Sequence, residues 1–402
     1  MDFNDLYNRY KTLVIFKSLI TDDEVLCSFT DVIDAIAWKD SDCAVEYYSN
    51  FIFRLYNYGD DFTEYLLNAV LENENIYIKK KGEGVKAGEL LDECLENELM
   101  LLEEISQISY DALREQIDFY DFLPRYKTHK ADFRKIYHER IENVSHFGYG
   151  IYSRYHVFII KEYDMDSEIV GVEHPDSISL SQLYGYERER GEVIDNTLAL
   201  LSGKPANNVL LYGDCGTGKS STVKAIANEY ASDGLRLIEI KKKQLHKIPD
   251  IVKQISRNPL KFILFIDDLS FTEDDEDFAA LKAILEGSVA SSADNLCIYA
   301  TSNRRHLIRE TFSARKGDEI HLNDTMQELL SLSDRFGLTV TYTKPDKQLY
   351  LSVAHDLAKQ YDVKLNDEEL KRQAEAFALS RGGRSPRTAK QFIEYLKGME
   401  KD

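Results

Sequence analysis

Residues 213–220 have the residue types and the spacing of a loop that binds phosphate groups. Their sequence, Gly-Asp-Cys-Gly-Thr-Gly-Lys-Ser, fits the pattern G-x-x-x-x-G-K-[ST] at every fixed position. Glycines allow the backbone to wrap tightly and to turn its N–H groups toward phosphate oxygens. Lys219 would contact the β- and γ-phosphates, and Ser220 would hold Mg²⁺. The predicted nucleotide-binding residues are Gly213, Asp214, Cys215, Gly216, Thr217, Gly218, Lys219, Ser220 and Ser221.

A second motif follows farther along the chain. Residues 262–266 are wholly apolar and predict a buried strand, and Asp267 and Asp268 come directly after them. Paired acids at this place indicate a Walker B motif, although two acids at a strand end can also cap a turn. Asp267 would bind the metal, and Asp268 would orient or deprotonate the water that attacks the γ-phosphate. Asp268 is one methylene shorter than the glutamate common at this position, which is compatible with slow hydrolysis.

Both motifs lie where apolar strands and helices alternate. The expected strands are residues 209–212, 235–240, 262–266, 296–301 and 338–343, and the expected helices between them are 219–231, 244–255, 278–289 and 324–333. Apolar strands that are joined through helices predict an α/β fold, with a parallel five-stranded sheet and helices on both faces. From residue 347 onward the pattern is helical only.

The N-terminal part of the chain is predicted to be mostly helical. Apolar residues recur there at helical spacing, and residues 89–105 are rich in Leu and Glu and lack Gly and Pro. Residues 151–161 are compatible with a strand, and residues 162–179 look like a linker. The expected organisation is a helical domain over 1–160, a linker over 161–180, an α/β core over 181–343 and a helical lid over 344–402.

The composition is that of a soluble folded protein with two or three domains. The chain has 402 residues, of which 43% are hydrophobic and 30% charged. Its net charge of −20 is uneven, because residues 1–180 carry 18 basic and 36 acidic residues and the remainder carries 32 and 34. The acidic front half argues against a broad nucleic-acid or membrane surface there. The longest apolar runs are far shorter than a membrane span requires.

The cysteines favour a reducing compartment. None of the five belongs to a C-x-x-C pair or stands at metal-ligand spacing from a histidine, so we expect neither disulfides nor a zinc site. The first residues also lack the basic and apolar segments of a secretory signal. A cytoplasmic location is therefore expected. Cys215, inside the phosphate-binding loop, would be either a small filler residue or a redox-sensitive thiol.

From residue 181 onward the sequence resembles the AAA+ ATPases. More narrowly, it is similar to the uncharacterised bacterial family catalogued as domain of unknown function 815. Besides the two motifs, the resemblance rests on KPANNVLLYG at residues 204–213, DDLSF at 267–271, ATSNRRHL at 300–307 and LSDRFGL at 332–338. It implies an AAA+ P-loop core with a C-terminal helical lid, and ATP and Mg²⁺ as bound groups. Over residues 1–160 it carries no motif, and the family lends no cellular role.

The resemblance assigns further residues to the nucleotide site. Asn303 matches sensor 1, which helps to position the attacking water, although an Asn there also suits a turn. Arg335 matches the arginine finger that stabilises charge on the γ-phosphate of a neighbouring subunit, with an internal salt bridge as the alternative. Arg387 matches the sensor 2 arginine of the lid, and Arg384 is the competing residue.

The stretch Leu-Tyr-Gly-Tyr at residues 183–186 resembles the segment that lines the adenine pocket in this class. Tyr184 or Tyr186 would therefore stack on the base. Plain packing of a linker is the alternative for both tyrosines.

An arginine finger is useful only in trans, so the resemblance also implies a homo-oligomer in the ATP state, arranged as a head-to-tail ring. Arg335 would then lie far from Lys219 within one chain and be exposed in a monomer. The helical N-terminal domain would bind an unknown protein partner. Residues 241–243 and 304–305 are the basic groups that a nucleic acid would use, but such short runs are typical of a solvated surface. No membrane partner is expected.

Two classes of function fit these features. The first is Mg²⁺-dependent ATP hydrolysis that is coupled to remodelling or loading of an unknown macromolecule. The second is a nucleotide-gated protein-interaction switch with little hydrolysis, or a loader associated with DNA.

Overall fold

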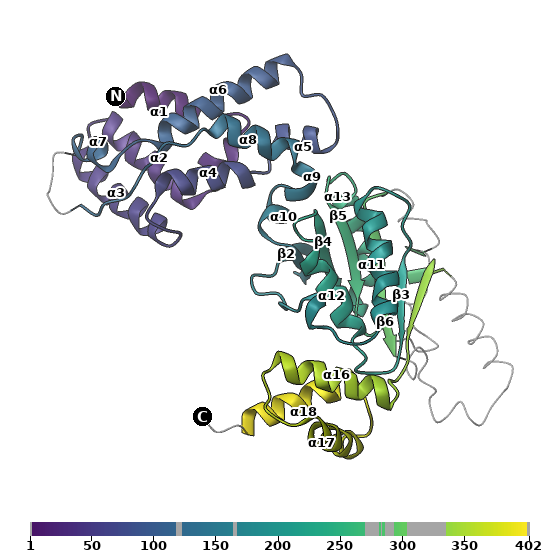
Figure 1. Cartoon of the computed structure of the whole chain (residues 1–402). Coiled ribbons are helices and arrows are strands. Elements are labelled where there is room, and N and C mark those ends of the chain that lie inside the picture. The colour runs from purple at the N-terminus through teal and green to yellow at the C-terminus, as the bar shows by residue number, and fades with distance from the viewer. Residues whose placement is uncertain are drawn as a thin grey trace. The chain divides into compact units, whose positions relative to one another are not determined.

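Two units make up the chain in the computed structural model, Met1–Arg154 and Tyr155–Asp402 (Figure 1). The structure describes residues 2–117, 123–163, 167–269, 281–282, 284–285, 293–303 and 335–399. The predicted helix over 324–333 and most of that over 278–289 lie outside these residues, as do the basic residues 304–305.

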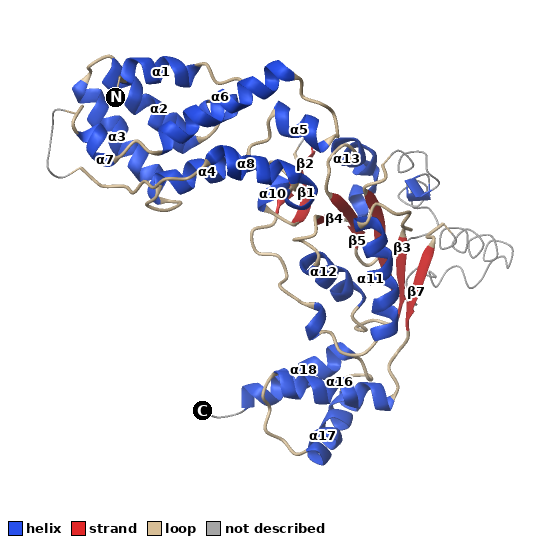
Figure 2. Ribbon diagram, turned by 45° about the horizontal axis from the view of Figure 1, so that its top comes forward, coloured by secondary structure: helices blue, strands red, loops and turns tan. Residues whose placement is uncertain are grey.

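The first unit is helical, as predicted (Figure 2). Its helices are α1 (Phe3–Lys11), α2 (Glu24–Ala37), α3 (Ser41–Tyr56), α4 (Phe62–Glu72), α5 (Ile76–Gly82), α6 (Glu89–Ser106), α7 (Tyr110–Arg114), α8 (Phe133–Glu142), α9 (Val144–Phe147) and α10 (Ile151–Arg154), with the 3₁₀ helix η1 at Lys17–Ile20.

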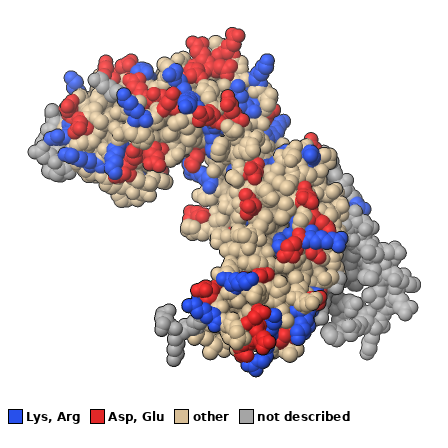
Figure 3. Space-filling view, in the orientation of Figure 1, with Lys and Arg blue, Asp and Glu red and all other residues tan. Residues whose placement is uncertain are grey.

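Short polar side chains start several of these helices, because they accept the free N–H groups of the first turn. Asp23 and Asp61 do so for α2 and α4. The apolar faces meet in one core, where the ring of Phe29 lies 5.2 Å from that of Phe51 and 4.6 Å from that of Phe62, measured between centroids. Acidic side chains are frequent on the surface of this unit (Figure 3).

The second unit contains one seven-stranded sheet. Its strands are β1 (Val157–Glu162), β2 (Ser167–Gly171), β3 (Val209–Gly213), β4 (Leu235–Ile240), β5 (Lys261–Ile266), β6 (Leu296–Asn303) and β7 (Leu338–Tyr342). They lie in the order β2-β1-β4-β5-β6-β3-β7. Every neighbouring pair is parallel except β1 and β2, which are antiparallel. The carboxyl ends of β3, β4, β5, β6 and β7 therefore share one edge.

The predicted number of five strands was wrong. The five expected strands all form, but β1 and β2 extend the sheet beyond β4. Strand β1 overlaps residues 151–161, which the sequence marked as compatible with a strand, whereas β2 lies in the presumed linker. Of β2, only Ile169 is buried, so the strand carries little apolar pattern of its own and depends on pairing with β1. The division between the units accordingly falls at Arg154 and Tyr155.

Helices surround the sheet and form a separate C-terminal layer. These are α11 (Glu187–Leu201), α12 (Lys219–Glu229) and α13 (Ile248–Ile255), with the 3₁₀ helices η2 (Leu180–Gln182) and η3 (Lys242–Lys247), followed by α16 (Lys347–Gln360), α17 (Asp367–Ser380) and α18 (Pro386–Met399). Apolar residues of α11 and α12 pack on one face of the sheet, and the last three helices share a core of their own. The predicted fold class, a P-loop α/β core with a C-terminal helical lid, is confirmed.

Within the part of the chain that the structure describes, no helix combines the length and the apolar character that crossing a bilayer requires.

Candidate functional site

The two sequence motifs meet at the carboxyl edge of the sheet. Strand β6 pairs in parallel with both β3 and β5, so Gly213, Ile266 and Asn303 end neighbouring strands. In open parallel sheets, ligands bind at this edge. A cavity of about 870 Å³ opens there, and its lining comes from the phosphate-binding loop, the ends of β5 and β6, residues 176–184, and the lid helices α16 and α18.

The loop that follows β3 has a backbone that glycine alone accommodates easily. Gly213, Gly216 and Gly218 have φ angles of 146°, 78° and 94°, in the region that residues with a Cβ rarely adopt. A Cβ on Gly213 would also clash with the carbonyl oxygen of Tyr342. Gly218 is the N-cap of α12 and brings no side chain to the free N–H groups of the first turn. Such free N–H groups at the start of a helix suit an anion, and this end of α12 borders the cavity.

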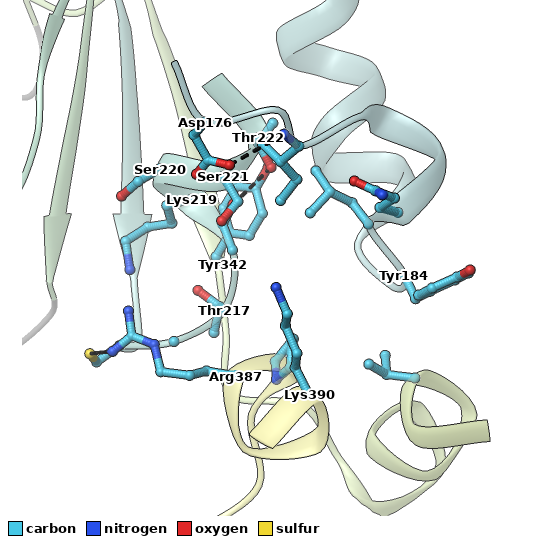
Figure 4. Close-up of a pocket in the computed structure, with 18 of the residues that line it drawn as sticks. Asp176, Tyr184, Thr217, Lys219, Ser220, Ser221, Thr222, Tyr342, Arg387 and Lys390 are labelled. Carbon is cyan, nitrogen blue, oxygen red and sulfur yellow. Dashed lines mark hydrogen bonds between the residues drawn. The ribbon is translucent and has the colours of Figure 1, made fainter. Parts of the chain in front are cut away.

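Lys219 places a cation in this loop. Its side chain is buried, with 6% of the residue exposed, and burial lowers the pKa of its ammonium group. The ammonium donates to the carbonyl oxygens of Gly213 and Asp214 at 3.2 and 2.7 Å and to Asn303 Oδ1 at 3.0 Å. These three acceptors are neutral. An anion bound in the cavity would provide the negative charge that pairs with the ammonium group. Figure 4 shows Lys219 and Ser220 on the wall of this cavity.

The two acids after β5 belong to one hydrogen-bonded chain. Ser220 Oγ and Thr301 Oγ1 both donate to Asp267 Oδ1, each at 2.6 Å. The backbone N–H of Asp268 donates to Thr301 Oγ1 at 2.9 Å, and Asn303 Nδ2 donates to Asp268 Oδ1 at 2.7 Å. Together with the bond from Lys219 to Asn303, these contacts link the cation, the acids and the two hydroxyl groups.

The donor set fits Mg²⁺. Ser220 and Asp267 present a hydroxyl and a carboxylate that already touch, and Mg²⁺ prefers oxygen ligands. Among the described residues, no group of three or more His, Cys, Asp or Glu side chains gathers as a metal cage. Magnesium does not need one, because it usually binds through one or two carboxylates together with waters and substrate phosphates.

The lid reaches the phosphate-binding loop through the start of α18. The backbone N–H of Arg387 donates to the carbonyl oxygen of Gly216 at 3.2 Å, and its guanidinium lies 3.7 Å from Cys215 Sγ. Arg384 instead forms a two-point ion pair with Glu375 of α17, with both N–O distances at 2.8 Å. Of these two arginines, only Arg387 lines the cavity, where Figure 4 shows it extending toward the loop.

This difference predicts opposite effects of two matched substitutions. Arg387→Ala should weaken ATP binding several-fold and leave thermal stability unchanged, because it removes a cation from the cavity. Arg384→Ala should leave ATP affinity within about two-fold and lower the thermal midpoint slightly, because it breaks a partly exposed ion pair. Nucleotide titration and thermal melts of both variants measure this. An equal loss of ATP affinity in both variants would mean that Arg384 also contributes to the nucleotide site.

The structure also separates the two tyrosines of residues 183–186. Tyr184 lines the cavity, and Figure 4 shows it on the side away from Lys219. Tyr186 is buried, donates from its hydroxyl to the carbonyl oxygen of Thr343 at 2.6 Å, and packs its ring 5.3 Å from that of Tyr342. Tyr186 therefore belongs to the core of the sheet, and Tyr184 is the tyrosine of this pair that a ligand in the cavity would meet.

The remaining loop residues differ in their surroundings. The N–H of Asp214 donates to the carbonyl oxygen of Tyr342 at 2.9 Å, and its Oδ2 accepts the N–H of Lys344 at 2.8 Å. Asp214 thus ties the loop to the connection between the core and the lid. Cys215 is exposed beside Arg387. Thr217 and Ser221 line the cavity.

Arg335 does not appear among the described residues that line the cavity, and it is half-buried rather than exposed as expected. It also makes an interaction within the chain.

Sequence reasoning missed several residues that line the cavity, among them Asp176, Thr301, Tyr342 and Lys390. Thr301 and Asn303 are two apart on one strand, a spacing that places side chains on the same face. Lys390 follows Arg387 by three on a helix, which also predicts a shared face. Asp176 lies in the presumed linker and carries no such pattern.

Parts of the chain are similar to known proteins. A stretch of the chain is 33% identical to the 26S proteasome regulatory subunit 6B homolog of Schizosaccharomyces pombe and covers 24% of this chain and 28% of that protein. The RuvB Holliday junction branch migration motor of Thermotoga maritima is 18% identical, with a TM-score of 0.38 over 55% of this chain and 65% of that one. AMPPCP-bound DnaA from Aquifex aeolicus is 18% identical, with a TM-score of 0.38. The match covers 56% of this chain and 67% of the DnaA chain.

These relatives fall in the AAA+ P-loop ATPase class, although the chain spans little more than a quarter of the proteasome subunit. A family model described as "Protein of unknown function (DUF815)" matches residues 153–400, which is more than half of the chain. The chain therefore belongs to the DUF815 family, as its sequence motifs predicted.

Proposed function

We propose that this protein binds Mg·ATP in the cavity between core and lid and hydrolyses the bond between its β- and γ-phosphates, so that ADP and phosphate are released. The observation that carries this proposal is the hydrogen-bonded chain in that cavity. It begins at Lys219, passes through Asn303, Asp268, Thr301 and Asp267, and ends at Ser220.

Each member of the chain would have a distinct task. Lys219 and the N–H groups at the start of α12 would hold the phosphates, and Ser220 and Asp267 would hold the metal. Bound Mg²⁺ would bridge phosphate oxygens and neutralise charge that develops on them. The Asp268 carboxylate, fixed by Asn303, would accept a proton from the attacking water. Arg387 would add a positive charge from the lid.

The cavity also has an apolar lining, which suits a nucleoside. Tyr184, Leu183 and Ile178 line it, as do Val353 and Leu357 of the lid helix α16. Aromatic and aliphatic walls with a few polar groups are typical of sites for a planar base. This lining supports adenine stacking on Tyr184.

The test is a pair of measurements on the full chain. Titration with a fluorescent ATP analogue should show saturable binding that tightens with Mg²⁺, and steady-state phosphate release should exceed that of the buffer. Absence of binding at millimolar nucleotide would refute the proposal. Binding of the analogue without release of phosphate would refute hydrolysis and favour the second candidate function, the nucleotide-gated switch described below.

Arg335 is proposed as the residue that completes the site of a neighbouring copy in an ATP-dependent homo-oligomer. Arg335→Ala should then keep ATP affinity and lose most hydrolysis, and mixing it with Lys219→Ala protein should restore part of the activity. The measurement is specific activity against protein concentration. Constant activity down to nanomolar protein, with a monomeric mass in ATP, would make Arg335 a structural residue.

A nucleotide-gated switch with little hydrolysis is the second candidate. It is favoured by the direct contact between the lid and the phosphate-binding loop, at Arg387 and Gly216, because a nucleotide that moves the loop would also move the lid. The short side chain of Asp268, already held by Asn303, is compatible with slow turnover.

We further propose that the first unit binds the macromolecule on which the ATPase acts, by remodelling or loading it. Trp38, Phe53 and Leu90 are exposed by 77%, 70% and 84%, so a partner that covered any of them would remove apolar area from water. A protein partner suits this acidic unit better than a nucleic acid does. A cytoplasmic location stays a prediction from cysteine usage.

A further inference from the structure

We propose that Thr301 is a positioning residue that fixes both acids of the nucleotide site, Asp267 and Asp268. This inference rests on the function proposed above and adds a residue to it that neither motif contains.

The hydroxyl group of Thr301 forms hydrogen bonds to both acidic residues. Thr301 lies on β6, and only 2% of it is exposed. Its Oγ1 donates to Asp267 Oδ1 at 2.6 Å and accepts the backbone N–H of Asp268 at 2.9 Å. A hydroxyl has one proton to donate, so this proton orients the first acid while a lone pair holds the second.

Asp267 Oδ1 receives more donors than it can keep. It accepts from Ser220 Oγ at 2.6 Å, from Thr301 Oγ1 at 2.6 Å and from the N–H of Asp268 at 3.1 Å. One carboxylate oxygen offers about two lone pairs. Ser220 is the donor that would leave, because its oxygen has to turn toward the metal. Thr301 then becomes the side chain that keeps the Asp267 carboxylate aimed at the same place.

Thr301 also holds the backbone of Asp268. Asp268 has a φ of 53°, in the left-handed region that residues other than glycine seldom adopt. The N–H groups on both sides of its Cα are tied to Thr301. Its own N–H bonds to the hydroxyl, and the N–H of Leu269 donates to the Thr301 carbonyl oxygen at 2.7 Å. This conformation places the Asp268 carboxylate against Asn303.

Two substitutions isolate the hydroxyl group. Thr301→Val keeps the shape and removes the hydroxyl, and Thr301→Ser keeps the hydroxyl and removes a methyl group. Partners that orient metal ligands typically account for about 10- to 100-fold in activity or metal affinity, so Thr301→Val should lower kcat by at least about 10-fold and raise the Mg²⁺ concentration for half-maximal activity several-fold. Binding of the ATP analogue without Mg²⁺ should change by less than about two-fold, since the phosphate-binding loop is intact. Thr301→Ser should restore both quantities.

Ser302 provides the matched control. It is the next residue on the strand, it is fully buried, and its hydroxyl donates to the carbonyl oxygen of Leu269 at 2.7 Å without touching either carboxylate. Ser302→Ala should lower the thermal midpoint and leave the Mg²⁺ dependence unchanged. If Thr301→Val does not fold, Thr301→Ala removes the hydroxyl without the second methyl group.

Several outcomes would overturn the proposal. An unchanged Mg²⁺ dependence and kcat in a folded Thr301→Val or Thr301→Ala protein would do so, and so would a Thr301→Ser protein as impaired as the valine variant. The same Mg²⁺ shift in Ser302→Ala would mean that general loosening of the strand is responsible. If the wild-type chain binds no Mg·ATP, the function proposed above fails first, and the role of Thr301 fails with it.

Discussion

Lys219→Ala should lower the affinity for ATP by at least about an order of magnitude, because it removes the one charge of the loop that would lie against the β- and γ-phosphates. The structure gives a second reason for a large effect. The ammonium group is buried and is held by two carbonyl oxygens and the Asn303 amide oxygen, all of which are neutral. A bound phosphate would therefore be the first anion in direct contact with the ammonium group. The charge–charge attraction gained on binding would be correspondingly large.

Lys224→Ala is the matched control for this substitution. Lys224 is on the same helix, α12, and pairs with Glu239 at 3.0 Å. It does not appear among the described residues that line the cavity. Its removal takes away the same charge from the chain and should leave ATP affinity unchanged. An equal loss of affinity in both variants, or no loss in Lys219→Ala, would defeat the assignment of the loop.

The lowered pKa of Lys219 adds a pH signature to the same experiment. Burial lowers this pKa below the ordinary value of 10.5, so the free protein loses the lysine proton at a lower pH than an exposed lysine would. ATP binds the charged form, so its affinity should be full below the lowered pKa and should fall as the pH rises through it. Lys219→Ala should lack this alkaline decline, which titrations at increasing pH would reveal.

The sequence predicted those parts of the site that are encoded in short contiguous stretches. The loop at 213–220 and the acids at 267–268 each combine an apolar strand with polar residues directly after it, and both strands formed where expected. Parallel pairing through β6 then brings the stretches together without further information. Local pattern and sheet topology were sufficient for these residues.

Features that depend on distant partners could not be predicted in this way. Arg384 and Arg387 look equivalent in sequence, and what separates them is Glu375 on another helix. The left-handed backbone of Asp268 and the buried carboxylate of Glu98, which accepts N–H groups from Ile15 and Phe16, likewise follow from tertiary contacts. Strand β2 has only one buried residue, Ile169, and pairs with β1, an edge that its own short sequence does not reveal.

Asp268→Asn should lower turnover by at least about 100-fold while Mg·ATP still binds, if Asp268 is the base that accepts the proton of the attacking water. Asparagine suits this position well. It tolerates the left-handed φ of 53°, and its amide oxygen can still accept the hydrogen bond from Asn303 Nδ2. The substitution therefore removes the negative charge and the basicity with little change in shape. Steady-state phosphate release and titration with an ATP analogue in Mg²⁺ would measure the two effects separately.

Asp267→Asn is the counterpart that decides which acid serves the metal. Asp267 touches Ser220, whereas Asp268 touches Asn303, so the two carboxylates face different members of the hydrogen-bonded chain. Loss of the Asp267 charge should raise the Mg²⁺ requirement and weaken binding of the metal–nucleotide complex, whereas Asp268→Asn should leave both nearly unchanged. If Asp268→Asn weakens binding and Asp267→Asn does not, the two roles are reversed. If Asp268→Asn hydrolyses ATP at the wild-type rate, the proton goes to another group, and the hydrogen bond between Asn303 and Asp268 has a structural role.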